Sequence, residues 1–237
     1  MKKTLLMAAI TAALASSVMA QGLVNFSGGT SAATRMSTNS IVGGPSAGLV
    51  AGAGSYYFAL FASSSQTSIN GSTAAISGLS GNYVFNNLGG GTASTGWVLV
   101  GIATNNASAG RFQPASQGTA SGNQAALNSD NSLTVTGIAG AGAANLVEIG
   151  WSASIGTTLA ALEAWYAAGA VGNYIGQSAI ASVTLGDGGT TATPNPLGTG
   201  AGQVGGILLG LTPVPEPGTL ALAALGGASL LLFRRKK

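Results

Sequence analysis

Carboxylates that could perform acid-base chemistry are few between residues 21 and 213: they are Asp130, Glu148, Glu163 and Asp187. Two carboxylates that flank a glycosidic bond can hydrolyse it, one as the acid and the other as the base or nucleophile. Glu148 is the most interesting of the four, because its apolar neighbours favour a strand on which burial would raise its pKa. The simpler interpretation is that strand alternation points Glu148 to solvent.

The other carboxylates have simpler explanations than catalysis. Asp187 precedes two glycines, which is typical of a turn, and Glu163 falls on the solvated face of a predicted helix. The chain has no Cys and no His, which excludes disulfides, Cys nucleophiles, thiolate metal sites and His general bases. We therefore expect no enzyme, with no catalytic, cofactor-binding or metal-binding residue. An envelope glycoside hydrolase that pairs Glu148 with Asp130 or Asp187 is the least favoured alternative.

Oxygen ligands for Ca²⁺ are offered by residues 128–131, which read Asn-Ser-Asp-Asn. One carboxylate is few for this hard cation, and the spaced acids of an EF-hand are missing. We expect instead a turn before a strand that starts at Ser132.

Aromatic side chains could form a platform for sugar rings, because apolar sugar faces pack on aromatic ones. The candidates are Trp97, Trp151, Trp165 and the pair Tyr56-Tyr57. A body of some 190 residues also needs large side chains in its core, and the chain has only 3 Trp, 5 Tyr and 6 Phe. We expect each Trp to pack in the core.

The elements that must position these residues are mainly short strands. Runs of β-branched and aromatic residues recur between Gly, Ser and Asn clusters, as strands and tight turns do. The predicted strands are Leu23–Phe26, Tyr56–Ala62, Tyr83–Phe85, Trp97–Ala103, Ser132–Ile138, Leu146–Ala153, Ile180–Leu185 and Ile207–Leu211. Eight such strands predict a mostly β fold, an antiparallel β-sandwich or jelly-roll-like domain with one short inserted helix.

That helix is predicted over residues 158–168, which are rich in helix formers. Leu159, Leu162 and Tyr166 would share one face. Thr157 or Thr158 would cap the N-terminus, and Gly169 would take the left-handed position after the last turn.

The positive charge of the chain is confined to its two ends. Between residues 21 and 213 only Arg35 and Arg111 are basic, against the four carboxylates, so this body has a net charge of −2. Proteins that bind nucleic acid need clustered Lys and Arg to neutralise phosphates. We exclude nucleic acid as a partner.

Residues 1–20 have the three parts of a secretory signal peptide: a basic start, an apolar run and a small-residue end. The apolar run, residues 5–15, is too short to span a bilayer. We predict cleavage by signal peptidase between Ala20 and Gln21, which leaves residues 21–213 as a β-rich extracytoplasmic domain.

Residues 214–237 predict a membrane-directed tail. A Pro-containing segment is followed by an apolar run, residues 219–233, and then by a basic end. Two prolines prevent a helix before Gly218, so we predict a transmembrane helix over 219–233, at roughly 22 Å short for a full span. The basic end should stay cytoplasmic, which places the body outside.

This tail resembles the PEP-CTERM sorting signal of Gram-negative bacteria. The resemblance implies processing by an exosortase, a membrane-embedded enzyme that recognises the motif residues Val214, Pro215, Glu216 and Pro217. It also implies a retention tail made of Arg234, Arg235, Lys236 and Lys237. Residues 21–26 and 176–186 loosely resemble segments of other proteins with such tails.

The resemblance implies a route through the inner membrane to the cell envelope, outer surface or extracellular matrix. We therefore expect a non-enzymatic structural or interaction protein associated with extracellular polysaccharide, as in a biofilm. Many Ser, Thr and Asn side chains and little charge suit weak multivalent contacts. A carbohydrate-binding module is the alternative from another class.

Overall fold

The computed structural model of the chain describes residues 21–29, 31–39, 47–79, 83–87, 96–114, 128, 130 and 132–213. The expected signal peptide, the sorting tail and its helix lie outside the described residues. Of the helices in the described ranges, none has the length and apolarity needed to cross a membrane.

Most described elements belong to one ten-stranded sheet, in which the strand order along the main path is β3-β2-β12-β10-β9-β4-β6-β7. Strand β11 adds to β9 and β5 adds to β10, while β1 and β8 form a separate two-stranded sheet. All pairs are antiparallel except β12 with β2. The strands are β1 (Gln21–Asn25), β2 (Ser37–Asn39), β3 (Gly48–Leu49), β4 (Tyr56–Ser63), β5 (Ile76–Ser77), β6 (Val98–Asn105), β7 (Phe112–Pro114), β8 (Ser132–Ala139), β9 (Ala143–Ser152), β10 (Tyr174–Gln177), β11 (Ala181–Thr184) and β12 (Leu208–Leu211).

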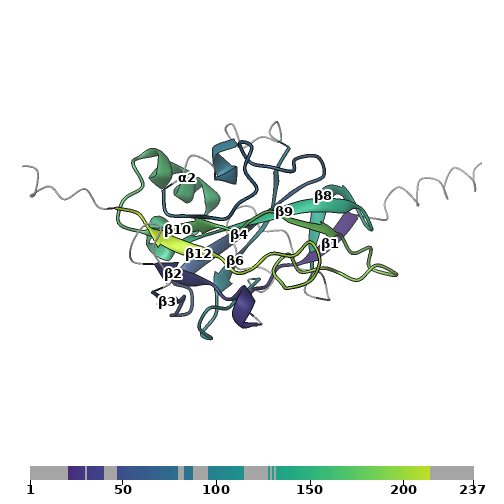
Figure 1. The fold of residues 1–237 in the computed structure, drawn as a ribbon, viewed down its shortest axis with the longest axis horizontal. Coiled ribbons are helices and arrows are strands. Elements are labelled where there is room, and N and C mark those ends of the chain that lie inside the picture. The colour runs from purple at the N-terminus through teal and green to yellow at the C-terminus, as the bar shows by residue number, and fades with distance from the viewer. Residues whose placement is uncertain are drawn as a thin grey trace, which may run out of the picture.

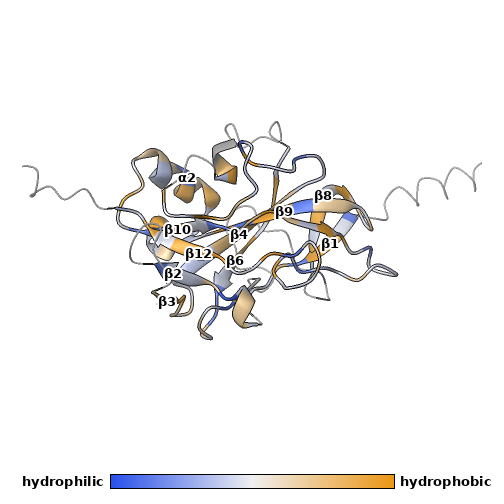
Figure 2. Cartoon of the chain, viewed as in Figure 1, coloured by the Kyte–Doolittle hydropathy of each residue, from blue (hydrophilic) through white to orange (hydrophobic). Residues whose placement is uncertain are grey.

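Strands β4 and β9 form the centre of the large sheet. They pair over eight positions, from Tyr56 opposite Ser152 to Ser63 opposite Asn145. Six consecutive residues of β4, from Phe58 to Ser63, are buried. A strand buried on both faces is apolar throughout rather than alternating, which is the pattern of this segment. Hydrophobic residues, orange in Figure 2, also occupy much of β12.

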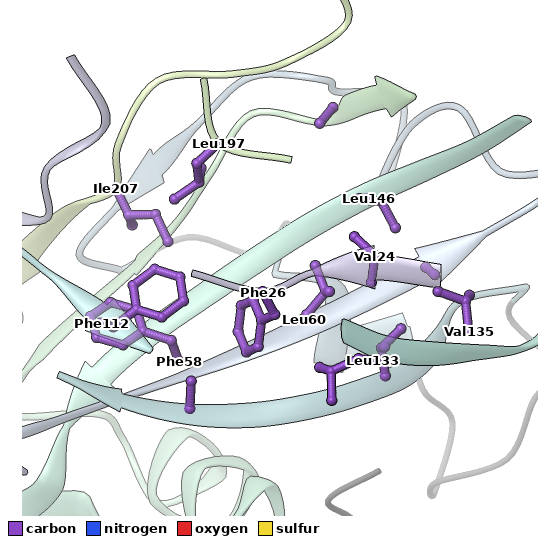
Figure 3. Close-up of a cluster of buried hydrophobic side chains, with 14 of the residues drawn as sticks. Val24, Phe26, Phe58, Leu60, Phe112, Leu133, Val135, Leu146, Leu197 and Ile207 are labelled. Carbon is purple, nitrogen blue, oxygen red and sulfur yellow. The ribbon is translucent and has the colours of Figure 1, made fainter. Parts of the chain in front are cut away.

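The β1–β8 sheet covers one face of the large sheet, and the core between them is called the β1 core here. Phe26 and Phe112 meet edge to face at 5.0 Å, and Phe112 stacks on Phe58 at 4.6 Å (Figure 3). Strand β1 lies between two neighbours, because Leu23 exchanges two hydrogen bonds with Gly186 on the side away from β8. The first strand of the described chain is therefore enclosed on both edges.

Helix α2 (Leu159–Ala167) covers the opposite face, together with the short 3₁₀ helix η2 (Val84–Asn87) (Figure 1). The core on this side is called the α2 core. Leu162 is fully buried in it and Leu159 nearly so, while Tyr166 packs edge to face on Phe85 at 5.1 Å. Thr158 caps the helix by accepting a hydrogen bond from the Ala161 N–H.

The structure confirms a mostly β fold with an inserted α-helix in the described part of the chain. Gly169 follows the helix with a positive φ of 114°, as predicted. The predicted strand Tyr83–Phe85 is wrong, because Val84 and Phe85 form the start of η2. Two other short 3₁₀ helices are η1 (Ala32–Thr34) and η4 (Ala153–Ile155). Strands β2, β3, β5, β7 and β10 were not expected.

Candidate functional site

Glu148 lies inside the fold, on the central strand β9. Only 1% of its surface is exposed, and within the described ranges neither carboxyl oxygen has a hydrogen-bond partner. Its backbone is held in place, because its N–H donates to Ser178 Oγ at 3.0 Å and its carbonyl accepts from the Ser178 N–H at 2.8 Å. Its partner on β4 is Leu60, and alternation puts it on the same face as Leu146. Both leucines belong to the β1 core (Figure 3).

The expectation that Glu148 points to solvent is therefore wrong. The alternation argument assumes a strand with one buried and one solvent-exposed face, but β9 has a core on each side. Burial raises the pKa of Glu148 well above its usual value, since a charged carboxylate is poorly solvated there. Burial therefore favours the protonated form of this carboxyl, and no substrate at the surface can contact it.

The carboxylates of Asp130, which is exposed, and Asp187, which is half-buried, accept hydrogen bonds within turns. Asp187 accepts hydrogen bonds from the N–H groups of Gly189 and Thr191, each at 2.8 Å, and these lower its pKa. Asp130 accepts from the hydroxyl and the N–H of Ser132, which lower its pKa too. Both residues therefore stabilise loop conformations, as the sequence predicted. Of the described residues, no three potential metal ligands gather in one place.

Two of the three tryptophans are core residues. Trp97 and Trp151 are 2% and 0% exposed. The Trp151 indole donates to the Gly156 carbonyl at 2.8 Å and stacks on Tyr57 with the ring centres 6.0 Å apart. Trp165 on α2 is half-buried at the edge of the α2 core. Only Trp165 keeps a partly exposed ring among the tryptophans that could contact a sugar.

The body ends at Thr212, just after β12. Thr212 is fully buried, and its N–H and hydroxyl both donate to the Asn173 carbonyl, at 2.8 and 3.0 Å. Its own oxygens accept from the N–H groups of Asn173 and Gly172, at 3.2 and 3.1 Å. The next residue, Pro213, is exposed. Thr212 is therefore held firmly to the start of β10 by its backbone and its side chain.

Comparison with known families identifies the segment that comes after Thr212. A family model described as the PEP-CTERM protein-sorting motif matches residues 213–236. The chain carries a PEP-CTERM sorting motif. No curated protein and no solved structure shows a significant match to the chain. The match confirms the resemblance seen in the tail, and it begins at Pro213, the residue after Thr212.

The sorting motif marks the chain as an exosortase substrate that is exported and directed to the cell envelope or surface. The motif residues and the basic end lie beyond Pro213, outside the described residues, as do Ala20 and the expected signal-peptide cleavage. The Thr212–Asn173 contact was not found from the sequence, because a Thr next to a strand is too common to be a signal.

Proposed function

We propose that this protein is a non-enzymatic structural or interaction protein of the cell surface or extracellular matrix, delivered there by exosortase processing of its tail. The sorting motif at residues 213–236 is the observation that carries the proposal. The burial of Glu148 and the use of Asp130 and Asp187 in turns support the absence of catalysis. The finer interpretation of the body as a β-sandwich is supported by the β1 core, which two sheets share.

The mature protein runs, in this proposal, from Gln21 to a residue near the Pro-Glu-Pro segment. Signal peptidase removes residues 1–20, and the apolar run 219–233 holds the chain in the inner membrane until exosortase cuts it. A body with two basic and four acidic residues offers mainly Ser, Thr and Asn groups for hydrogen bonds to neutral polysaccharide. Such contacts are individually weak and gain strength by repetition.

Mass spectrometry of the protein from wild-type cells and from cells without the exosortase tests the sorting step. We expect a wild-type product that starts at Gln21 and lacks residues 234–237, and a longer product in the mutant cells. A wild-type product that keeps the basic end would overturn the proposal.

Binding of purified mature protein to polysaccharide from the same cells tests the second step. We expect weak binding that increases when the protein is immobilised at high density, and that Trp165→Ala leaves unchanged. A large loss of binding in Trp165→Ala would favour the carbohydrate-binding module instead, because that half-buried ring would then act as a stacking platform.

A further inference from the structure

The distance between the folded body and the bilayer is limited by the position of Thr212. Four hydrogen bonds hold this residue to Gly172 and Asn173, so the chain cannot extend further without unfolding that contact. Six residues, 213–218, separate it from the apolar run. Six extended residues span at most roughly 20 Å. An enzyme that cuts within this segment must therefore lie beside the body.

The end of the body from which the tail departs has a distinctive surface. Val171 and Leu79 are 43% and 46% exposed, which makes them two of the few large hydrophobic residues at the described surface. Val171 precedes Gly172, which donates to Thr212, and Leu79 follows Gly78, which donates to the Ile175 carbonyl at 2.9 Å. Both therefore lie next to β10 and β12 where the described chain ends.

The chain segments that contain β10 and β12 also lack charge. Neither residues 164–186 nor residues 188–215 contain a single Asp, Glu, Lys or Arg. Strand β1 lies toward the other end of the long axis of the body, so the first strand is far from this surface (Figure 1). We call the exposed residues Leu79, Val171, Gly172 and Pro213 the exit face.

We propose that the exit face is a docking surface for the membrane-embedded exosortase, which rests against it while cutting the tail. The proposal rests on the proposed function above. Uncharged segments with two exposed apolar side chains suit a contact with another protein, because the centre of such a contact is depleted of charged residues. Because Thr212 is held in place, the sorting motif begins within two residues of this surface along the chain. The body takes part in its own processing instead of being passive cargo.

Acidic substitutions on the exit face test the contact in cells that produce the full chain. Val171→Asp and Leu79→Asp should each slow tail removal in a pulse-chase experiment by about threefold or more, because each places an unpaired charge in an apolar contact. Val98→Asp is the matched control. Val98 is 38% exposed, and it lies opposite Ala62 at the end of the sheet away from the exit face.

A flexible Gly/Ser insert of about ten residues after Pro213 distinguishes a loss of docking from other effects of the substitutions on tail removal. With the insert the body no longer has to lie against the enzyme, so Val171→Asp and Val98→Asp should be processed at equal rates. Two results would refute the docking surface. One is that Val171→Asp and Val98→Asp are processed at equal rates without the insert, and the other is that Val171→Asp slows processing as much with the insert as without it. Failure of exosortase to cut the unaltered chain would instead refute the proposed function.

Discussion

Glu148 should make the body less stable as the pH rises, and replacing it with Gln should remove this effect. A group whose pKa is higher in the folded than in the unfolded state binds more protons when folded. Its stabilising contribution is complete below about pH 4 and is lost as the pH rises toward the folded pKa. Burial, which leaves 1% of Glu148 exposed with no partner for either oxygen, places this residue in that class.

The expected size can be calculated from proton linkage. While the folded carboxyl keeps its proton and the unfolded one has lost it, each pH unit lowers the free energy of unfolding by about 1.4 kcal/mol. In a domain of this size, each such pH unit corresponds to a fall in Tm of roughly 3–6 °C.

Thermal unfolding of purified mature protein, followed by circular dichroism at several pH values, measures this slope. Glu148→Gln keeps the side-chain volume and has no proton to lose, so its Tm should fall much less over the same range. Glu163→Gln is the control, because Glu163 is half-buried and its pKa is raised less. Parallel pH profiles for the unaltered protein and Glu148→Gln would show that the folded carboxyl is charged and that the reasoning is wrong.

Three further substitutions test the packing of the body. Gly176→Ala should cost about 1–3 kcal/mol in chemical unfolding, because its new Cβ would lie 2.3 Å from the Leu208 carbonyl oxygen, whereas Gly48→Ala meets nothing within 4 Å and should be neutral. Thr158→Ala should lower the free energy of unfolding by about 1 kcal/mol, because the helix loses its cap. Thr157 is exposed, so the control Thr157→Ala should lower it far less, and equal Tm values for the two variants would contradict the role of the cap. Trp165→Phe should remove most of the tryptophan fluorescence that acrylamide quenches, because the other indoles are buried; strong residual quenching would contradict their burial.

Strands with continuous apolar sequence were predictable, and short polar ones were not. Residues 56–62 and 97–103 became β4 and β6 because their side chains suit a strand with cores on both faces. Strand β10 contains Gly176 and Gln177, which favour strands poorly, and its pairing with β9 depends on distant residues. The signal for such a strand is in its neighbours rather than in its own residues.

The predictions of a strand at Tyr83–Phe85 and of a solvent-exposed Glu148 were wrong for the same physical reason: tertiary contacts decide both. Val84 donates its N–H to the Gln177 side chain at 2.8 Å, and the Tyr83 hydroxyl donates to the Gly78 carbonyl. These partners replace the ladder that a strand would have needed. For Glu148, alternation could not show that a second layer, the β1–β8 sheet, covers the face of β9 that was expected to be exposed to solvent. Single-sequence patterns do not include that layer.

The position of β1 determines when this body can close. Asn25 donates its backbone N–H to the Pro194 carbonyl and its side-chain amide to the Thr193 carbonyl, 168 positions later. A translocation channel that threads the chain from its N-terminus delivers β1 first and these partners almost last. One edge of the earliest segment to cross therefore stays without its partners until nearly all of the body has crossed as well. Completion of export and completion of folding become almost the same event.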